Sequence, residues 1–175
     1  MNQKYIITGA PGTGKTSIIN ELINRGYNCI KENSREVIAE QIITGGEILP
    51  WKNQIAFENK ILNLRVEQYL ATPKDCISFF DRSAIDSVAY LKLNNLEITE
   101  EIIKNINKCH FNKKVFFTPF WQEIYVNDNE RVECINQAIN IENAILETYR
   151  KQNYILIKVP KHPIKERVNF ILSQV

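Results

Sequence analysis

The feature that most restricts how this chain can fold is a glycine-rich octapeptide that fits the pattern G-x-x-x-x-G-K-[ST] in full. Its members are Gly9, Ala10, Pro11, Gly12, Thr13, Gly14, Lys15 and Thr16. In such a loop the glycines let backbone N–H groups curl round phosphates, and the N-terminus of the following helix adds positive potential. We expect Lys15 to reach the β and γ phosphates of ATP or GTP, Thr16 to bind Mg²⁺, and Ser17 to complete the nucleotide site.

The alternative for this octapeptide is a plain glycine-rich turn without a ligand. An apolar, β-branched run over 4–8 precedes the loop, and apolar residues at helical spacing follow it from Lys15. A strand that enters the loop and a helix that leaves it are the context in which this motif binds phosphates. The sequence therefore favours nucleotide binding.

Five short apolar runs alternate with helical patterns along the chain. They predict strands over 4–8, 27–30, 76–80, 114–117 and 154–159. Helical spacing predicts helices between them, including one whose buried stripe comprises Val37, Ile38, Ile42 and Ile43. Alternating strands and helices indicate an α/β fold of three layers, αβα, with a five-stranded parallel sheet.

Length and composition indicate one domain over 1–175. The 22 Lys and Arg residues nearly balance the 20 Asp and Glu residues, so no overall charge favours nucleic acid or an anionic membrane. No apolar run is long enough for a signal peptide or a membrane span. The scattered residues Cys29, Cys76, Cys109 and Cys134 do not have zinc spacing, and they are expected to be buried thiols in a cytoplasmic protein.

An acid and an arginine follow the third predicted strand, in the run Phe79-Phe80-Asp81-Arg82. A protein of this kind needs a carboxylate at a strand end to hold Mg²⁺ or its water shell, and we assign that role to Asp81. The alternative for Asp81 is a helix cap. Arg82 is expected to clamp a phosphate or an acceptor molecule, and its alternative is an ion pair with a surface carboxylate.

Glu32 and Arg35 come just after the second predicted strand. In open parallel sheets, ligands bind in the crevice outside the carboxyl ends of the strands. We therefore expect both residues to contact the acceptor, and Glu32 is a candidate to take the proton of an attacking hydroxyl. The alternative for Glu32 is a carboxylate that only stabilises a helix start.

Two irregular stretches, 45–53 and 121–130, are candidates for substrate-binding loops or a lid. Arg131 opens a helical pattern behind the second stretch, which makes 119–131 a candidate lid and Arg131 a candidate to close on the transferred phosphoryl group. An exposed surface arginine is the alternative. Trp51 and Trp121 lie in these stretches, where they either stack on a ring or serve in packing.

Four segments together carry a family resemblance: the glycine-rich octapeptide, Glu32 to Val37, Phe79 to Tyr90 and Pro119 to Arg131. The chain resembles small AAA-like domains with a nucleoside and nucleotide kinase-like fold, a family that includes the ribosylnicotinamide kinase domain of bacterial regulators of NAD biosynthesis. The resemblance spans nearly the whole chain. It implies Lys15 and Thr16 on phosphates and Mg²⁺, Asp81 as the acid of the third strand, and Arg131 in a lid.

The chain also departs from the pattern of this family in several ways. Arg82 after the strand-end aspartate is similar to the Asp-Arg pair of thymidylate-type kinases, whereas the nicotinamide-specific domain does not have it. An attached adenylyltransferase domain is not expected either. Nicotinamide riboside is therefore not the expected acceptor. The chain is also too short for a full AAA+ module, and Asp81 lacks the following Glu that positions water in ATPases, so a hexameric motor is not expected.

Together these features predict a kinase that transfers the γ-phosphoryl group of ATP, with Mg²⁺, to a small nucleoside, nucleotide or related metabolite. Either Asp81 or Glu32 is expected to orient the acceptor hydroxyl or take its proton. The alternative is a nucleotide-dependent switch or slow ATPase that acts on a protein or nucleic-acid partner. A GTPase is disfavoured because the chain has no N-K-x-D motif.

Overall fold

The computed structural model describes residues 3–124 and 135–175. In that part of the chain, five parallel strands form one sheet in the order β2-β3-β1-β4-β5. The strands are β1 (Lys4–Thr8), β2 (Asn28–Ile30), β3 (Ser78–Asp81), β4 (Lys114–Phe117) and β5 (Ile155–Lys158). The helices are α1 (Lys15–Asn24), α2 (Ser34–Thr44), α3 (Gln54–Ala71), α4 (Ala84–Leu93), α5 (Glu100–Ile106), α6 (Ile135–Lys151) and α7 (Ile164–Leu172).

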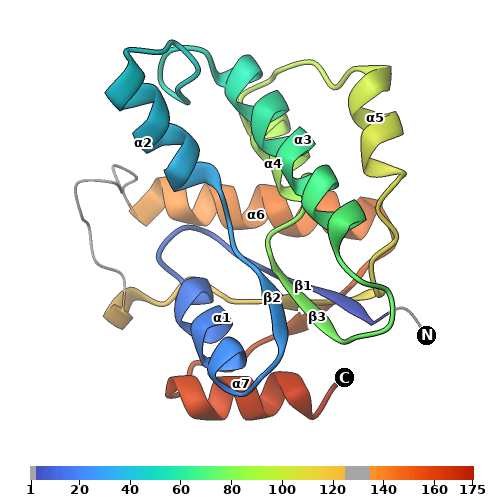
Figure 1. Ribbon diagram of the computed structural model, residues 1–175. Helices are drawn as coiled ribbons and strands as arrows, with labels where there is room; N and C mark the ends of the chain where they lie inside the picture. The colour runs from blue at the N-terminus through green and yellow to red at the C-terminus, as the bar shows by residue number, and fades with distance from the viewer. Residues whose placement is uncertain (1–2, 125–134) are drawn as a thin grey trace.

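Helices cover both faces of the sheet, which gives the three-layer αβα arrangement that the sequence predicts (Figure 1). Helices α1 and α7 pack on one face, and α3, α4, α5 and α6 lie on the other. Consecutive strand residues point to opposite faces of a sheet. Phe79 therefore joins the core beneath α1 and α7, whereas the next residue, Phe80, joins the larger core beneath α4 and α6.

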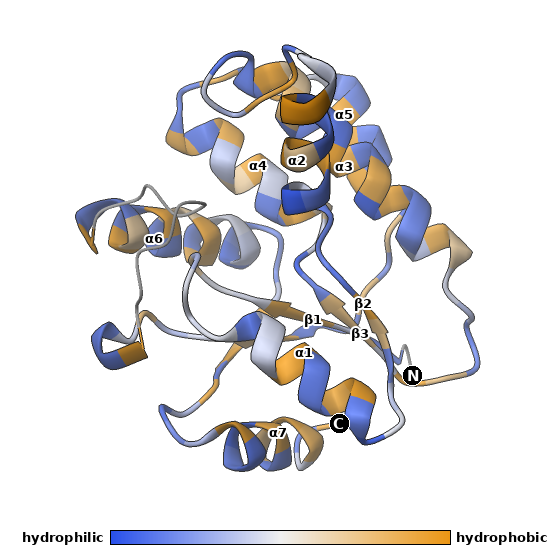
Figure 2. Cartoon of the chain, turned by 60° about the vertical axis from the view of Figure 1, so that its left-hand side comes forward, coloured by the Kyte–Doolittle hydropathy of each residue, from blue (hydrophilic) through white to orange (hydrophobic). Residues whose placement is uncertain are grey.

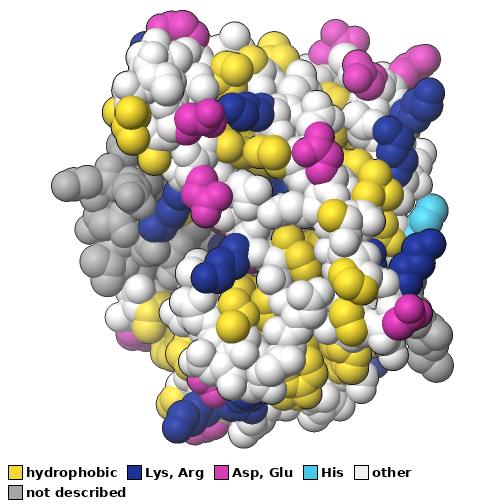
Figure 3. All heavy atoms as spheres, in the orientation of Figure 1, with side chains coloured by type: hydrophobic (Ala, Val, Ile, Leu, Met, Phe, Trp, Pro, Cys, Tyr) yellow, Lys and Arg dark blue, Asp and Glu magenta, His cyan; other side chains and the backbone are white. Residues whose placement is uncertain are grey.

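The hydropathy of the elements follows from this layering (Figure 2). The central strands β1, β3 and β4 are mostly hydrophobic and almost fully buried, as strands inside a parallel sheet are. The edge strands β2 and β5 are half-buried or exposed. The surface helices carry mixed sequences, and Ile18, Ile19 and Leu22 of α1 form its buried stripe. Basic and acidic side chains are interspersed over the face shown in Figure 3, in line with the net charge of +2.

The structure corrects one predicted helix and adds another. The predicted stripe of α2 is wrong in its second half, because the side chains of Ile42 and Ile43 are 59% and 84% exposed while Val37 is buried. Helix α2 packs against α3 through Val37, which contacts Phe57 and Ile61. Further along α2, Glu40 forms an ion pair with Lys60 of α3 at 3.1 Å. Helix α4, which the sequence analysis did not identify, follows β3 directly and packs against both α3 and α6.

None of the helices in residues 3–124 and 135–175 is both long enough and apolar enough to cross a lipid bilayer.

Candidate nucleotide and acceptor site

The phosphate-binding loop joins the end of β1 to the start of α1, at the carboxyl edge of the sheet. Lys15 is 6% exposed and donates hydrogen bonds to the carbonyl oxygens of Gly9 and Ala10, at 3.0 and 2.8 Å. Burial and the neighbouring Arg82 guanidinium lower the pKa of Lys15 to about 8, against the opposing effect of Asp81. A loop with a buried ammonium group at its centre is suited to bind an anion.

Two glycines of the loop have conformations and surroundings that exclude a side chain. Gly9 has a φ of +148°, and a Cβ there would overlap the Thr118 carbonyl and hydroxyl oxygens. Gly14 has a φ of +82°, and a Cβ would lie 2.7 Å from Nη1 of Arg167. Both close approaches hold the loop in place, so the glycines of the motif serve its shape as well as its access to phosphates.

Thr118 and Arg167 support the loop from behind. The Thr118 hydroxyl donates to the Thr8 carbonyl oxygen at 3.0 Å and lies 2.7 Å from the Thr13 hydroxyl. Arg167 of α7 is 2% exposed and donates from Nη2 to the Thr13 carbonyl oxygen at 3.0 Å. Thr118, directly after β4, and Arg167 of α7 thus fix the backbone of a loop that lies more than a hundred residues earlier in the sequence.

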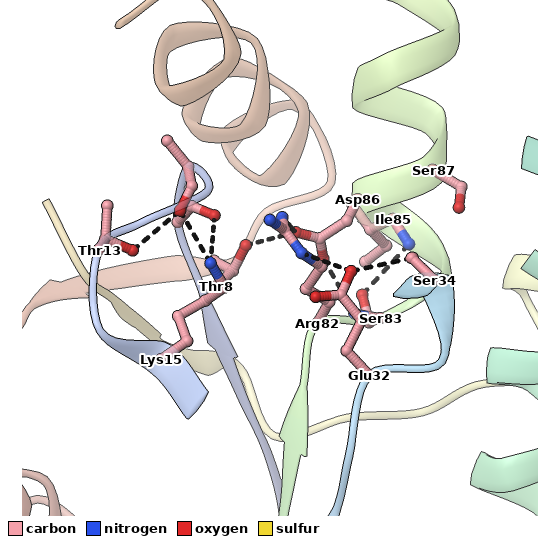
Figure 4. Close-up of polar contacts among 12 residues, drawn as sticks. Thr8, Thr13, Lys15, Glu32, Ser34, Arg82, Ser83, Ile85, Asp86 and Ser87 are labelled. Carbon is pink, nitrogen blue, oxygen red and sulfur yellow. Dashed lines mark hydrogen bonds and ion pairs between the residues drawn. The ribbon is translucent and has the colours of Figure 1, made fainter. Parts of the chain in front are cut away.

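Glu32 and Arg82 meet at the ends of strands β2 and β3 (Figure 4). Oε1 of Glu32 lies 3.0 Å from Nε of Arg82 and 3.1 Å from Nη2 of Arg65, and it accepts a hydrogen bond from the Ser34 hydroxyl at 3.0 Å. Burial acts to raise the pKa of Glu32, but Arg82, Arg65 and Lys15 outweigh it and lower that pKa to about 2. Glu32 is therefore a carboxylate at every physiological pH.

Arg82 has an unusual backbone as well as a buried side chain. Its φ is +71°, a left-handed conformation that is uncommon for a residue other than glycine, and its side chain is 4% exposed. It contacts Asp86 through Nη1 at 3.2 Å as well as Glu32. A backbone conformation of this kind persists only where the surroundings enforce it, and such residues cluster at functional sites.

Asp86 is the centre of a buried polar network that connects β1, α4 and α6. Figure 4 shows the part of this network around Thr8, Ser83 and Asp86. Its Oδ1 accepts from the Thr8 hydroxyl at 2.5 Å, and its Oδ2 accepts from the Tyr149 hydroxyl at 2.6 Å and from the backbone N–H of Ser83 at 2.9 Å. With Ser83, Asp86 also forms the capping box of α4. This network fixes the strand end that carries Arg82 relative to the start of the phosphate loop.

Asp81 lies at the end of β3 and is 5% exposed. Its Oδ1 is buried and has no hydrogen-bond partner among the described residues. Burial and the nearby Glu32 raise the pKa of Asp81 to about 6, against the opposing charges of Lys15 and Arg82. A buried carboxylate oxygen without a partner, beside the phosphate loop, fits a group that binds a cation or its water shell.

One cavity of about 660 Å³ connects the phosphate loop with the Glu32–Arg82 pair. The loop and the start of α1 form part of its wall, and helix α3 with the segment before it forms another part. Aromatic side chains contribute to the lining, and they are Trp51, Phe57 and Tyr90. A cavity of this size, lined by charged, polar and apolar side chains, has the dimensions of a small-molecule site.

The structure brings most of the predicted site residues to this cavity. The cavity is lined by Pro11, Gly12, Gly14, Lys15, Thr16, Ser17, Glu32, Arg35 and Arg82. Gly9, Ala10 and Thr13 are buried within the loop and support it. Asp81 lies behind this lining, and Arg131 lies outside the described residues, as does most of the predicted lid over 119–131.

The structure also places several residues for which the sequence leaves alternatives open. Arg82 pairs with buried and half-buried carboxylates rather than with a surface carboxylate. Trp51 is 62% exposed and lines the cavity. Of the cysteines, Cys109 is buried as expected, Cys29 and Cys76 are only half-buried, and Cys134 lies outside the described residues.

The sequence analysis missed four residues of the site, Glu58, Arg65, Asp86 and Arg167. Glu58 and Arg65 lie on the buried face of α3 among apolar residues, and a charged residue at such a position is a usable signal. Ser83-x-x-Asp86 is a capping-box pattern that indicates both Asp86 and helix α4. For Arg167 the sequence offers no comparable signal, because nothing in the pattern of α7 sets this arginine apart from one on the surface of a helix.

Comparison with solved structures places this fold among P-loop kinases. Deoxyadenosine kinase from M. mycoides with products dCMP and a flexible dCDP bound superposes with a TM-score of 0.72 at 18% identity, over 98% of this chain and 97% of that one. Thymidylate kinase from Candida albicans gives 0.68 at 16% identity, over 99% and 90%. The NadR protein in complex with NR gives 0.74 at 13% identity, over 98% of this chain but only 50% of NadR.

The superpositions show that these proteins share a nucleoside and nucleotide kinase-like P-loop fold. At such low identities they show the fold alone. No curated protein matches this chain in sequence. The family model described as AAA domain does match, over residues 4–167. That span begins with β1, contains the phosphate loop and the ends of β2 and β3, and closes at Arg167 beneath the loop. The chain belongs to this AAA domain family.

Proposed function

We propose that this protein is a kinase that transfers the γ-phosphoryl group of ATP to a hydroxyl group of a nucleoside or nucleotide. One observation carries the proposal: the phosphate loop and the Glu32–Arg82 pair line the same cavity. A phosphoryl donor and an acceptor must lie side by side for transfer, and this cavity has a wall suited to each. Two kinases of similar fold are named for deoxyadenosine and thymidylate, and these names support a nucleoside or nucleotide as the acceptor.

Lys15 would bind the β and γ phosphates of ATP. To do so its ammonium group exchanges the hydrogen bonds to the Gly9 and Ala10 carbonyls for phosphate oxygens. The charge of the phosphates favours the protonated amine, which raises the pKa of Lys15 back above 8. The backbone N–H groups of the loop and the start of α1 add further stabilisation of the phosphates.

Thr16 and Asp81 would hold Mg²⁺ between them and the phosphates. Oδ1 of Asp81 has no hydrogen-bond partner in residues 3–124 and 135–175, and it suits this role because a carboxylate oxygen is a preferred Mg²⁺ ligand, directly or through water. Bound Mg²⁺ supplies charge neutralisation on the phosphates. Among the described residues, no group of three acidic, histidine or cysteine side chains forms a separate metal site.

Glu32 would orient the acceptor hydroxyl and take its proton. The oxygen of that hydroxyl forms a bond to the γ-phosphorus while the bond from that phosphorus to the β,γ-bridging oxygen breaks, which leaves ADP. Phosphoryl transfer passes through a loose transition state in which the nucleophile gains little charge, so a weakly basic carboxylate suffices. Arg82 would contact the transferred group or the acceptor, and its ion pairs with Glu32 and Asp86 hold it in position.

The test is ADP formation from Mg-ATP in the presence and absence of nucleosides and nucleoside monophosphates, with Lys15→Ala as the blank. We expect at least one compound of these classes to raise turnover many-fold. Turnover that stays low with every compound, although ATP binds, would contradict the proposal and favour the nucleotide-dependent switch.

A further inference from the structure

The wall that helix α3 contributes to the cavity carries a buried acid with no part in the transfer described above. Glu58 is 5% exposed and lines the cavity, next to Phe57 on the same helix. Among the described residues it makes no ion pair, although Arg65 lies two helical turns further along the same face. A carboxyl group buried without an ionic partner is costly unless it is protonated or serves a ligand.

The surroundings of Glu58 come from three elements. On α3 itself Arg65 faces Glu58, and its charge favours the carboxylate. The Ser87 hydroxyl on α4 and the Arg82 guanidinium after β3 also lower the pKa of Glu58. Glu32, after β2, raises that pKa. The Arg65 guanidinium is not devoted to Glu58, because it donates hydrogen bonds to Glu32, to the Ser83 carbonyl oxygen and to the Ser87 hydroxyl.

A protonated carboxyl group has a donor and an acceptor side by side, at the spacing of an amidine edge. An amidine edge combines a ring nitrogen that accepts a hydrogen bond with an exocyclic amino group that donates one, as in adenine and cytosine. A carboxylate, by contrast, only accepts, and it would repel the lone pair of that ring nitrogen. The aromatic side chains of Trp51, Phe57 and Tyr90 line the same cavity and suit a flat ring.

We propose that Glu58 determines the acceptor by pairing, as a carboxylic acid, with the amidine edge of an aminopurine or aminopyrimidine nucleoside. The O–H of Glu58 donates to the ring nitrogen, and its other oxygen accepts from the exocyclic amino group. This inference rests on the proposed function for its acceptor class, and it adds the residue that reads the base. Keto bases such as hypoxanthine and uracil have a different edge.

The protonation equilibrium of Glu58 supports this assignment. Burial raises its pKa to about 7, against the opposing effects of Arg65, the Ser87 hydrogen bond and Arg82. The acid form therefore falls from about nine-tenths at pH 6 to about one-tenth at pH 8. Binding of an amidine edge should weaken about tenfold over that range. Guanine presents two donors to the same place and should bind the carboxylate better, which reverses the trend.

The experiment measures binding of single nucleosides to the full-length protein by calorimetry at pH 6, 7 and 8, without ATP. The probes are adenosine with inosine as its keto counterpart, cytidine with uridine, and guanosine, each also as the deoxynucleoside. Glu58→Gln keeps a donor and an acceptor but does not titrate. Glu58→Leu removes both, and Glu67→Gln, on the exposed side of the same helix, is the matched control.

We expect adenosine or cytidine to bind the unmodified protein and Glu67→Gln about tenfold more tightly at pH 6 than at pH 8. Glu58→Gln should bind the same nucleoside with an affinity that does not change with pH. Glu58→Leu should lose about tenfold or more at pH 6, with its fold checked by thermal unfolding. The adenosine and cytidine arms separate the two base classes that share this edge.

Two results would overturn the inference: a pH dependence that persists in Glu58→Gln, or equal binding of amino and keto nucleosides. These results are independent of phosphoryl transfer. Nucleosides that bind as expected but are never phosphorylated would contradict the kinase and leave the role of Glu58 intact. Phosphorylation without any preference for an amino base would support the kinase and contradict the role of Glu58.

Discussion

Nε of Arg82 lies 3.0 Å from Oε1 of Glu32, so the arginine that follows strand β3 and the acid that follows strand β2 form one charged pair at the edge of the sheet. The pair faces the cavity that the phosphate loop also lines. Arg65 shares the same carboxylate oxygen at 3.1 Å. Glu32 is therefore both fixed in position and kept ionised, which are the two properties that a group needs to orient a hydroxyl nucleophile.

The first prediction concerns the charge of Glu32. In Glu32→Gln the side chain keeps its shape but cannot take a proton, so kcat with the acceptor should fall by about 10² to 10⁴, while ATP binding changes little. The matched control is Glu36→Gln, an exposed acid on the same helix start, which should retain activity. Steady-state kinetics with an ATP-binding titration separates the two effects, and an active Glu32→Gln would rule out this role.

A second prediction concerns the glycines. Gly14→Ala puts a Cβ into a left-handed conformation and 2.7 Å from the buried guanidinium of Arg167, so it should disturb the loop and weaken ATP binding by at least about tenfold. Gly45→Ala has a similar φ of +66° but no atom within 4 Å of its Cβ. It should lower stability by about 1 kcal/mol and leave ATP affinity unchanged. Equal affinities in the two variants would be inconsistent with this account of the loop.

The network around Asp86 gives a third prediction. Tyr149→Phe removes a hydroxyl that donates to Asp86 at 2.6 Å and lies 2.8 Å from the Ser83 hydroxyl. It leaves both partners buried and short of a hydrogen bond, which should cost about 1 to 3 kcal/mol. Thermal unfolding should show a Tm lower by roughly 2 to 4 °C for each kcal/mol.

The control for this change is Tyr27→Phe. The ring of Tyr27 packs edge-on against Phe79, but its hydroxyl makes no hydrogen bond within the described part of the chain. Its Tm should hardly change. A Tm for Tyr149→Phe as high as that of the control would show that the hydroxyl network adds no stability.

The fourth prediction is the effect of pH on stability through Glu58. The pKa of Glu58 is about 7 in the folded protein and has the ordinary value of 4.5 in the unfolded chain, so folding favours the protonated form. Its contribution is complete below pH 4.5 and is lost as the pH rises through 7, which costs of the order of 3 kcal/mol. Glu58→Gln should therefore be more stable than the unmodified protein at pH 8. Denaturant unfolding at pH 5 and pH 8 measures this, and an equal slope with pH in both proteins would refute it.

The sequence predicted the fold because its signals are local. Each strand is a short apolar run, and Lys15 begins a helix directly after a loop whose pattern fixes the connection. The structure confirms the parallel sheet of five strands and its two helical layers. Ile42 and Ile43 misled the analysis because helical spacing does not tell whether another element covers the end of a helix.

The site was predictable to a smaller extent. The loop, the acid after β2 and the acid that ends β3 lie at the carboxyl edge of the sheet, where parallel topology brings strand ends together. The ion pair of Glu32 with Arg65 depends on how α3 packs, which no local pattern gives. The contact between Arg167 and Thr13 joins residues that are 154 positions apart, so only the folded chain reveals it.

The fate of the γ-phosphoryl group tests the central claim most directly. ATP labelled at the γ-phosphate is incubated with Mg²⁺, the protein and each nucleoside or nucleoside monophosphate in turn, and the labelled products are separated, with Lys15→Ala as the blank. The account predicts that with one class of acceptor the label moves to the acceptor hydroxyl, in equal amount to the ADP formed. Label that appears only as inorganic phosphate, at a rate that no acceptor changes, would contradict it.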